Sequence, residues 1–504
     1  MKSIVASQAR NALRNAARGK YRAPCSAIRW SSSETEARQW STPLAKQLSE
    51  AITATGPIPL ASFMRMCLTS DVGGYYTSKQ EGRDQFGQKG DFITSPEISQ
   101  IFGELIGIWF VAEWMAQGKK RKGVEFIEIG PGRGTLMDDM LRTIRNFQPM
   151  VVAIEAVYMV EASPALRESQ KQLLCGDKEM VETEIGWRCI SKYADIPIIW
   201  TENIRFVPSD HDKTPFIVAH EFFDALPIHA FQSIPPPPQE PTTIKTPTGS
   251  YELTPDAAAI QAKKTPGPQW REMVVSATPQ TYSSKQSPDE FHLTLSPAPT
   301  PHSLYLPSLS PRYKTLLPTP GSLIEISPES LTYTGAIATL IGGSSEHPKK
   351  TPSGAALILD YGPSATIPIN SLRGIRDHQY VSPFSAPGLV DLSADVDFTG
   401  LAEAALMASP GVEVHGPVEQ AGFLSAMGIR ERAEMLVKGL EKSKWVAGKG
   451  GKDEGVDKRI REVQGAWRRL VDRGGSGMGK VYKALAIVPE SGGRKPVGFG
   501  GDVV

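Results

Sequence analysis

Between residues 124 and 145 the spacing of the apolar residues changes from that of a β-strand to that of an α-helix. Val124 to Ile129 alternates and is partly β-branched, a pattern typical of a buried β-strand. Glycines follow at 130, 132 and 134, and Leu136 to Arg145 then has the apolar spacing of an α-helix. We therefore predict a strand, a glycine-rich turn and a helix N-terminus. Such a turn directs backbone N–H groups and the positive end of the helix dipole towards a ligand at the carboxyl end of the strand.

Further segments continue this alternation of strand and helix. Four of them have the pattern of strands in the same sheet: Ala156 to Val160, Phe216 to His220, Ala355 to Tyr361 and Lys480 to Val488. Acidic residues follow two of these strands, Glu161 after the first and Glu221 with Asp224 after the second. In a doubly wound sheet the carboxyl ends of neighbouring strands open onto the ligand crevice. We therefore expect these acids to lie at one site.

The spacing of the glycines indicates the class of ligand. A dinucleotide fingerprint, G-x-G-x-x-G, counted from Gly130 and Gly132 requires a glycine where this chain has Thr135, and the third glycine is Gly134. The string Glu128-x-Gly130-x-Gly132-x-Gly134 instead resembles motif I of the S-adenosylmethionine-dependent methyltransferases. In that class the acid lies near the methionine ammonium, and the glycines let the backbone close on the amino-acid part of the cofactor. The alternative is a left-handed turn that binds nothing.

Glu161 is the candidate residue for binding the nucleoside half of such a cofactor. An acid at the tip of the second strand is placed to accept hydrogen bonds from both ribose hydroxyls. Glu161 lies 31 residues after Gly130, whereas about 20 is usual. We attribute the difference to an extended helix and loop through residues 146–155. The alternative for Glu161 is an ordinary solvated acid at a strand end.

The N-terminal segment has a charge pattern of its own. The first 33 residues contain seven basic residues and no acid, and Arg10, Arg14 and Arg18 share one helix face. This pattern predicts a mitochondrial transit peptide, with a disordered basic tail as the alternative. Subtracting seven charges from the formal charge of +1 gives −6. A mildly acidic chain has no electrostatic footprint for nucleic acid, and no apolar run has the length of a membrane span.

The cysteines and histidines predict no metal site. The four cysteines are scattered without a C-x-x-C pair, and no His–Cys cluster stands in the sequence. We therefore expect neither a bound metal nor a disulfide framework.

Longer strings extend the resemblance well beyond the glycine loop. They are Gly90-Asp91-Phe92-x-Thr94-Ser95-Pro96-Glu97, Glu221-Phe222-Phe223-Asp224-Ala225-Leu226-Pro227, Leu357-Ile358-Leu359-Asp360-Tyr361-Gly362 and Arg373-Gly374-Ile375-Arg376-x-His378. With these strings the chain is similar to the MidA family, the mitochondrial methyltransferase assembly factors of respiratory complex I. The matches extend from about residue 42 to residue 488. One position departs from the family, which usually has Asn where this chain has His220.

The resemblance implies both a fold and an activity. The implied fold is α/β, a doubly wound, seven-stranded, Rossmann-like methyltransferase sheet whose last strand runs antiparallel. The implied activity is symmetric dimethylation of an arginine in a complex I core subunit, in the mitochondrial matrix, with S-adenosyl-L-methionine as the methyl donor. Two alternatives stay open: methylation of another matrix substrate, and a non-catalytic complex I assembly chaperone. The sequence does not predict an oligomeric state.

Glu221 and Asp224 are the candidate catalytic residues. A guanidinium is a poor nucleophile because it stays protonated far above neutral pH. Carboxylates that bind its N–H groups would orient it, balance its charge and accept the departing proton. The alternative is that these two acids only hold the loop, with Glu97 or Asp91 nearer the chemistry.

Changes in composition divide the chain. Between Ser233 and Pro320 stand 18 of the 41 prolines, and we expect a β-rich, proline-rich insertion there, a possible substrate module. The predicted segments are a transit peptide (1–33), an N-terminal helical region (40–120), a methyltransferase core in two parts (121–232 and 321–440) around the insertion (233–320), a polar loop (441–477), the last core strand (478–490) and a flexible tail (491–504).

Overall fold

A computed structural model describes residues 38–77, 93–236, 243–246, 249–252, 267–279, 289–446, 454–475 and 477–501. The predicted transit peptide, residues 1–33, lies outside the described residues. So does Asp91.

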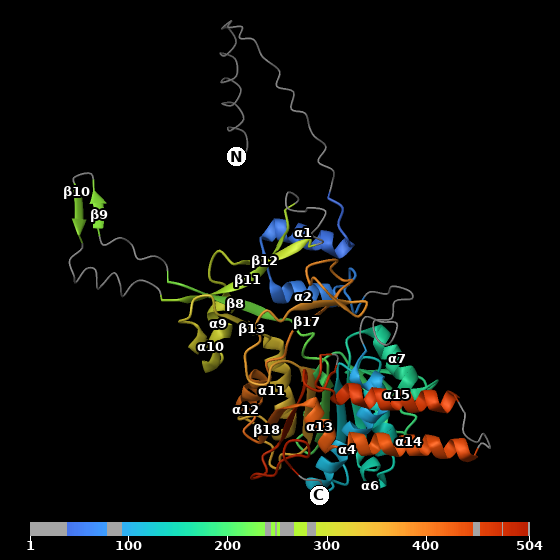
Figure 1. Cartoon of the computed structure of the whole chain (residues 1–504). Helices are drawn as coiled ribbons and strands as arrows, with labels where there is room; N and C mark the ends of the chain where they lie inside the picture. Colours follow the sequence, from blue (N-terminus) through green and yellow to red (C-terminus); the bar gives the residue numbers. More distant parts are fainter. Residues whose placement is uncertain are drawn as a thin grey trace, which may run out of the picture. The chain divides into compact units, whose positions relative to one another are not determined.

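The central element is a nine-stranded sheet in the order β18-β19-β14-β7-β2-β3-β6-β5-β4. It occupies the lower half of Figure 1, where its edge strand β18 is labelled. Strands β2, β3, β6, β7 and β14 are mutually parallel, and β19 is antiparallel to β14. The predicted doubly wound sheet with an antiparallel last strand is therefore confirmed, and the antiparallel strands β5 and β4 add an extension at one edge. The bounds are β18 Val412–Glu419, β19 Tyr482–Pro489, β14 Ala355–Tyr361, β7 Thr214–His220, β2 Val124–Ile129, β3 Ile154–Val160, β6 Pro197–Thr201, β5 Gly186–Ile190 and β4 Val181–Thr183.

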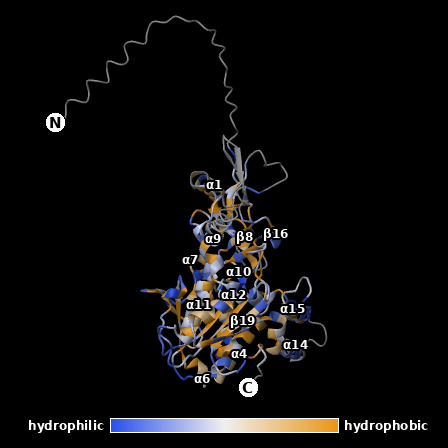
Figure 2. Ribbon diagram, turned by 90° about the vertical axis from the view of Figure 1, so that its left-hand side faces the viewer, coloured by the Kyte–Doolittle hydropathy of each residue, from blue (hydrophilic) through white to orange (hydrophobic). Residues whose placement is uncertain are grey.

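Both faces of this sheet are covered, so its central strands are buried along their whole length. Every residue of β2 is buried. Phe126 points into one core, with helices α4, α5, α14 and α15, and Ile127 points into the other, with α11 and α12. Figure 2 shows the hydrophobic strands enclosed between these helix layers. The bounds are α4 Gln100–Ala116, α5 Thr135–Ile144, α14 Ile429–Val446, α15 Glu454–Val471, α11 Pro328–Gly342 and α12 Phe398–Ala408.

A second, antiparallel sheet is built around β11 (Gln269–Ala277). It pairs with β1 (Ile58–Pro59), β8 (His229–Ile234) and β12 (Phe291–Leu295), and β13 (Leu323–Ile326) pairs with β8. The helices α1 (Pro43–Thr55) and α2 (Leu60–Thr69) share a hydrophobic core with this sheet. The sheet therefore draws strands from the N-terminal region, from within the proline-rich segment 233–320 and from both sides of it. Because β8 begins soon after β7 ends, it is joined directly to the segment that carries Glu221 and Asp224.

The polar loop expected over residues 441–477 is wrong. Helix α14 continues to Val446, and α15 occupies Glu454–Val471. In α15 the residues Val463, Trp467 and Leu470 recur at intervals of three and four and pack against the core that contains α4. All charged residues of α15 except Asp457 are exposed, so composition alone concealed the apolar stripe.

The flexible tail expected from residue 491 is also wrong for its described part. The Trp109 Nε1 atom donates a hydrogen bond to the Val497 carbonyl at 3.0 Å, and Arg494 pairs with the buried Glu113 at 2.6 Å. Phe499 is 8% exposed and lies between Trp109 and Phe423. Residues 491–501 therefore pack on α4.

Within the described ranges, no helix is long and apolar enough to cross a membrane.

Phe499→Ala tests the packing of residues 491–501 on α4. Removing a buried phenyl ring should lower the free energy of unfolding by about 2–4 kcal/mol, because it leaves a cavity beside Trp109. Met407→Ala, at a position 76% exposed, is the control and should change it by less than about 0.5 kcal/mol. Urea unfolding followed by tryptophan fluorescence measures both. Equal stability of the two variants would show that the tail does not contribute to the core.

Candidate active site

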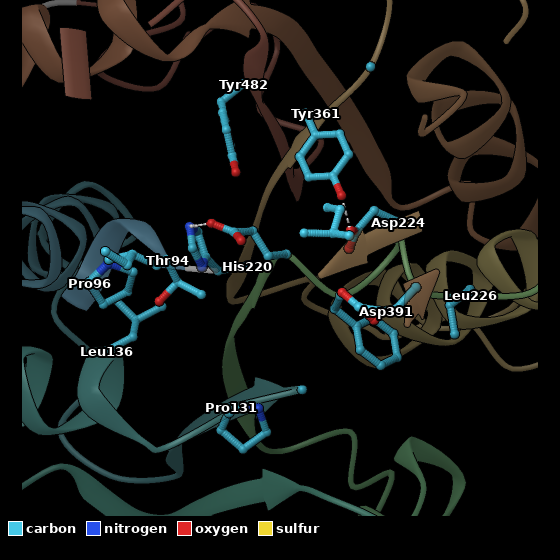
Figure 3. A pocket seen from close by; sticks show the side chains of 18 of the residues that line it. Thr94, Pro96, Pro131, Leu136, His220, Asp224, Leu226, Tyr361, Asp391 and Tyr482 are labelled. Carbon is cyan, nitrogen blue, oxygen red and sulfur yellow. Dashed lines mark hydrogen bonds and ion pairs between the residues drawn. The ribbon is translucent and has the colours of Figure 1, made fainter. Parts of the chain in front are cut away.

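A cavity of about 1390 Å³ opens at the carboxyl ends of the central strands (Figure 3). Its lining includes the turns after β2, β3 and β7, the end of β14 and the start of β19. All the predicted site residues except Gly134 are among the lining residues: Glu128, Gly130, Gly132, Glu161, Glu221 and Asp224. The volume exceeds the roughly 300–1,000 Å³ typical of a small-molecule site, so the cavity has room for more than a cofactor.

The glycine turn after β2 needs its glycines. Gly130, Gly132 and Gly134 all have positive φ angles, 66°, 52° and 83°, which L side chains rarely adopt. At Gly130 space is a second reason, since a Cβ atom would lie 2.6 Å from Cδ2 of Phe222. Gly134 is the residue before α5, so the turn leads directly into a helix N-terminus. The turn thereby brings bare backbone close to the cavity.

Glu128 stands at the end of β2 as a buried acid. Its side chain is 2% exposed, and its Oε2 atom has no hydrogen-bond partner in the part of the chain that the structure describes. Burial raises the pKa of Glu128 well above its usual value, and the Met137 backbone amide opposes this shift. A buried carboxyl oxygen without a partner is costly unless a ligand satisfies it.

Glu161 is buried too, but its carboxylate is held. Its Oε1 atom accepts a hydrogen bond from the Ser163 backbone N–H at 2.7 Å, and Oε2 accepts one from Nε2 of Gln170 at 3.1 Å. Burial raises the pKa of Glu161 to about 7, and these two donors oppose the shift. The carboxylate is thus fixed at the tip of β3, beside the glycine turn.

Gln170 is a site residue that the sequence analysis missed. It lies in α7 (Pro164–Cys175), wholly buried, and its Nε2 atom also donates to the Gly132 carbonyl at 2.7 Å. Its Oε1 atom accepts from Nε1 of Trp200 at 2.9 Å. One amide therefore ties the glycine turn to Glu161 and to the neighbouring strand β6. The available signal was a polar residue four positions before Leu174, on the buried face of the helix.

The turn after β7 is fixed by another residue that the sequence analysis did not select, Asp360. This acid is wholly buried in β14, and its Oδ2 atom accepts hydrogen bonds from the backbone N–H groups of Phe222, Phe223 and Asp224 at 3.2, 2.9 and 3.4 Å. The same turn contains Glu221 in a left-handed conformation, with φ 49°. A non-glycine residue in that region is strained and persists only where its surroundings hold it.

Glu221 is enclosed at the end of β7. Burial raises the pKa of its carboxyl well above the usual value, the nearby Asp224 raises it further, and the Tyr482 hydroxyl and the Ser95 backbone amide oppose the shift. Its Oε1 atom has no hydrogen-bond partner among the described residues and lies 3.4 Å from Nε2 of His220 (Figure 3). Burial lowers the pKa of His220 to about 3. His220 is therefore neutral at physiological pH, so this contact is not an ion pair.

Asp224 forms the second acid of the same turn. Its Oδ2 atom accepts a hydrogen bond from the Tyr361 hydroxyl, while Oδ1 has no partner within the described ranges (Figure 3). Burial raises the pKa of Asp224, and the Tyr361 hydroxyl and the charge of Arg373 oppose the shift. Arg373 stands 4.6 Å from the centroid of the Tyr361 ring and pairs with Asp395 at 2.8 Å. The Tyr361 hydroxyl thus holds Asp224 by a hydrogen bond, and the Tyr482 hydroxyl holds Glu221 in the same way.

Glu97, the alternative acid, has other contacts. Its Oε2 atom accepts a hydrogen bond from the Thr94 backbone N–H at 3.3 Å, which completes a capping box at the start of α3 (Ser95–Ile98). Its Oε1 atom lies 3.6 Å from Arg133. Glu97 lines the cavity and lies near enough to Glu221 for its charge to raise the pKa of that acid, but its own carboxylate is engaged at the start of α3.

The comparisons with known proteins agree with this geometry. A family model described as "Putative S-adenosyl-L-methionine-dependent methyltransferase" matches residues 105–418. The chain is 36% identical over 425 residues to the human mitochondrial protein arginine methyltransferase NDUFAF7, with 83% of this chain and 79% of the human protein covered. It is 34% identical over 479 residues to the Xenopus tropicalis protein of the same name, with 93% and 92% covered.

A solved structure supports the fold independently. The chain is similar to the crystal structure of a "COG1565 superfamily member and likely methyl transferase" from Burkholderia thailandensis, which has S-adenosyl-homocysteine bound. The two superpose with a TM-score of 0.59 at 19% sequence identity, and the match covers 91% of this chain and 93% of the other. The family model and the relatives together show that the chain belongs to the family of S-adenosyl-L-methionine-dependent methyltransferases that the model describes. It is accordingly an enzyme that uses S-adenosyl-L-methionine.

Gln170→Leu tests the bridge between the glycine turn and Glu161. The variant keeps a similar volume but donates no hydrogen bond, so it leaves the Gly132 carbonyl and the Glu161 carboxylate without that partner. We expect S-adenosyl-homocysteine to bind about 10–100-fold more weakly, a loss of roughly 1.5–3 kcal/mol. Calorimetric titration measures it. Gln172→Leu, on the exposed face of the same helix, should bind like the parent, and an unchanged affinity of Gln170→Leu would exclude the bridge.

Proposed function

We propose that this enzyme transfers methyl groups to an arginine side chain of a mitochondrial protein. The observation that carries the proposal is a pair of acids on one turn, the buried Asp224 and Glu221, whose side chain is 12% exposed. Each has one buried carboxyl oxygen that has no partner within the described ranges. A guanidinium offers N–H donors in a planar fork that suits two such oxygens. The names of the relatives, mitochondrial protein arginine methyltransferases, support the same substrate.

The cofactor roles are part of this proposal. The free oxygen of Glu128 would accept from the methionine ammonium, and the bare backbone at Gly130, Gly132 and Gly134 would lie against the amino-acid part of the cofactor. Glu161, held by Gln170, would accept hydrogen bonds from the ribose hydroxyls. The bound cofactor supplies a sulfonium methyl group for in-line attack. The residues of this chain would hold the cofactor in position, because the Gln170 amide ties the glycine turn, against the amino-acid half, to Glu161, the acid for the ribose half.

The acceptor side needs an oriented guanidinium that can lose a proton. Glu221 and Asp224 would bind its N–H groups and direct one nitrogen towards the methyl group. As the new N–C bond forms, that nitrogen loses a proton, and the free oxygen of Glu221 is the acceptor we propose. Neutral His220 beside it adds no competing positive charge. Tyr361 and Tyr482 would keep the two carboxyl groups turned towards the cavity.

The finer parts of the function rest on the family resemblance. We propose symmetric dimethylation of an arginine in a complex I core subunit during assembly, in the mitochondrial matrix, after removal of residues 1–33. Another matrix substrate through the same site is the alternative within the enzyme class. The non-catalytic chaperone is disfavoured by the intact set of Glu128, the three glycines and Glu161 around one cavity.

Glu221→Gln and Asp224→Asn test the acid pair. Each change keeps the shape but removes the charge, so methyl transfer should fall about 10²–10⁴-fold while S-adenosyl-homocysteine binds as before. Transfer of labelled methyl groups to proteins from mitochondria that lack the enzyme measures the activity. The control is Glu441→Gln, an exposed acid in α14, which should be fully active. Full activity of both site variants would remove the pair from the chemistry.

Proton release tests the same pair in a different way. Burial raises the pKa of both acids, and a bound cation favours their ionised forms. Binding of a guanidinium should therefore release protons, and affinity should increase with pH, by up to about tenfold per pH unit for each proton released. The probe is acetyl-arginine amide, titrated between pH 6 and 8 with S-adenosyl-homocysteine present. Acetyl-citrulline amide, which is uncharged, is the control.

The release can be counted directly. Calorimetry in two buffers of different ionisation enthalpy gives the number of protons, and Glu221→Gln should lower that number. An affinity for acetyl-arginine amide that is the same at pH 6 and pH 8 would contradict the proposed role of the two acids, whatever the activity of the enzyme.

A further inference from the structure

A group of metal-ligating side chains lies outside the active site, where the second sheet meets a short helix. His229 begins β8, Glu272 lies in β11, and His302 lies in α9 (Pro301–Tyr305). None of the three lines the cavity described above. One ligand atom from each lies within 4.8 Å of the ligand atoms of the other two. The proposed mechanism uses none of them.

The fold brings these residues together from three segments. Glu272 pairs with Phe231 across the antiparallel strands β11 and β8, so it is the diagonal neighbour of His229 on the same face. The chain returns to Glu272 after β12, where the Ser296 backbone N–H donates to the Glu272 carbonyl at 2.8 Å. The helix α9 then begins beside the carboxylate. The cluster is therefore positioned by backbone pairing and not only by its side chains.

The distances are close to those of a metal site. The Nδ1 atom of His229 lies 2.7 Å from Oε1 of Glu272, and Nδ1 of His302 lies 3.5 Å from Oε2. Ligand atoms about 2.0–2.1 Å from a tetrahedral zinc ion stand about 3.4 Å apart. The two observed separations lie on either side of this value but run to different oxygens of Glu272, so the side chains would rotate to bring one ligand atom of each residue onto a common ion.

The surroundings of the three side chains are those expected of a metal site. Glu272 is wholly buried and His229 is 7% exposed, whereas the side chain of His302 is 45% exposed and leaves a path from solvent. Thr300 donates a hydrogen bond to Oε2 of Glu272, and the Phe231 ring stacks on His229 with an interplanar angle of 9°. Such outer contacts orient metal ligands.

We propose that His229, Glu272 and His302 bind a divalent transition metal, with zinc as the best fit. Two imidazole nitrogens and one carboxylate oxygen suit zinc, whereas calcium and magnesium prefer oxygen ligands alone. On binding, the proton on the Nδ1 atom of His229 moves to Nε2, so the ring stays a neutral imidazole and its Nδ1 lone pair binds the ion beside Glu272. Water completes the coordination. The ion joins β8, β11 and α9, so it stabilises the start of the strand that follows the Glu221 and Asp224 turn. The sequence alone predicted no metal site, because the fold brings these three residues together from segments far apart in the chain.

The test uses the full chain without a histidine tag, stripped of metal with a chelator. Zinc, titrated in competition with a chromophoric chelator, should bind one ion per chain with a dissociation constant below about 10 μM. Zinc should raise the thermal midpoint, because it binds only the folded chain. Cobalt should give the visible absorption of a tetrahedral site.

His302→Ala is the informative variant, because its side chain is half exposed and its loss should not disturb the fold. It should weaken zinc binding at least tenfold and abolish the cobalt spectrum. His292→Ala, at an exposed position of β12, should bind zinc like the parent. No zinc binding by the parent chain, or equal binding by His302→Ala, would overturn the proposal and leave the cluster as a hydrogen-bonded group. S-adenosyl-homocysteine binding, measured on the same samples, reports the methyltransferase site separately.

Discussion

The carboxylate of Asp360 is the interaction on which the acceptor side of the site depends. It is wholly buried at the end of β14 and accepts three consecutive backbone N–H groups from the turn after β7. Those N–H groups would otherwise point into the protein without partners, because Glu221 takes a left-handed conformation and ends the strand. The strained turn is therefore stable only because the neighbouring parallel strand ends in an acid. That turn carries both Glu221 and Asp224.

The cofactor side is organised in the same way by Gln170. In both places one buried polar side chain satisfies several groups of a strand-end turn: the backbone N–H groups of 222–224 in one case, and the Gly132 carbonyl with the Glu161 carboxylate in the other. Buried polar networks of this kind are rigid when every member has a partner. Glu128, Glu221 and Asp224 line the cavity, and each has a buried oxygen without a partner within the described ranges, so we assign these oxygens to ligands.

Features that depend on local strand and turn chemistry could be predicted from the sequence. The strand Val124–Ile129 coincides with β2, and the glycines after it need the left-handed conformations that the structure has. The distant residue that completes each turn could not be predicted. Gln170 and Asp360 act through contacts across 38 and 137 residues, and a polar residue on an apolar face was the only local sign. The helix α15 and the packed tail were missed because their charged residues hid a few apolar positions that match a distant core.

His220 shows why a departure from the family pattern need not mark a lost activity. A histidine beside two acids would ordinarily take up a proton and compete with a bound cation for their charge. Here the ring is buried at the end of β7, in edge-to-face contact with Phe102, and burial lowers its pKa to about 3. At physiological pH it is as uncharged as the asparagine usual in the family, and like asparagine it offers a hydrogen-bonding nitrogen at that place. The acid pair therefore keeps its free oxygens for a cationic substrate, which favours an active enzyme over a chaperone with a vestigial site.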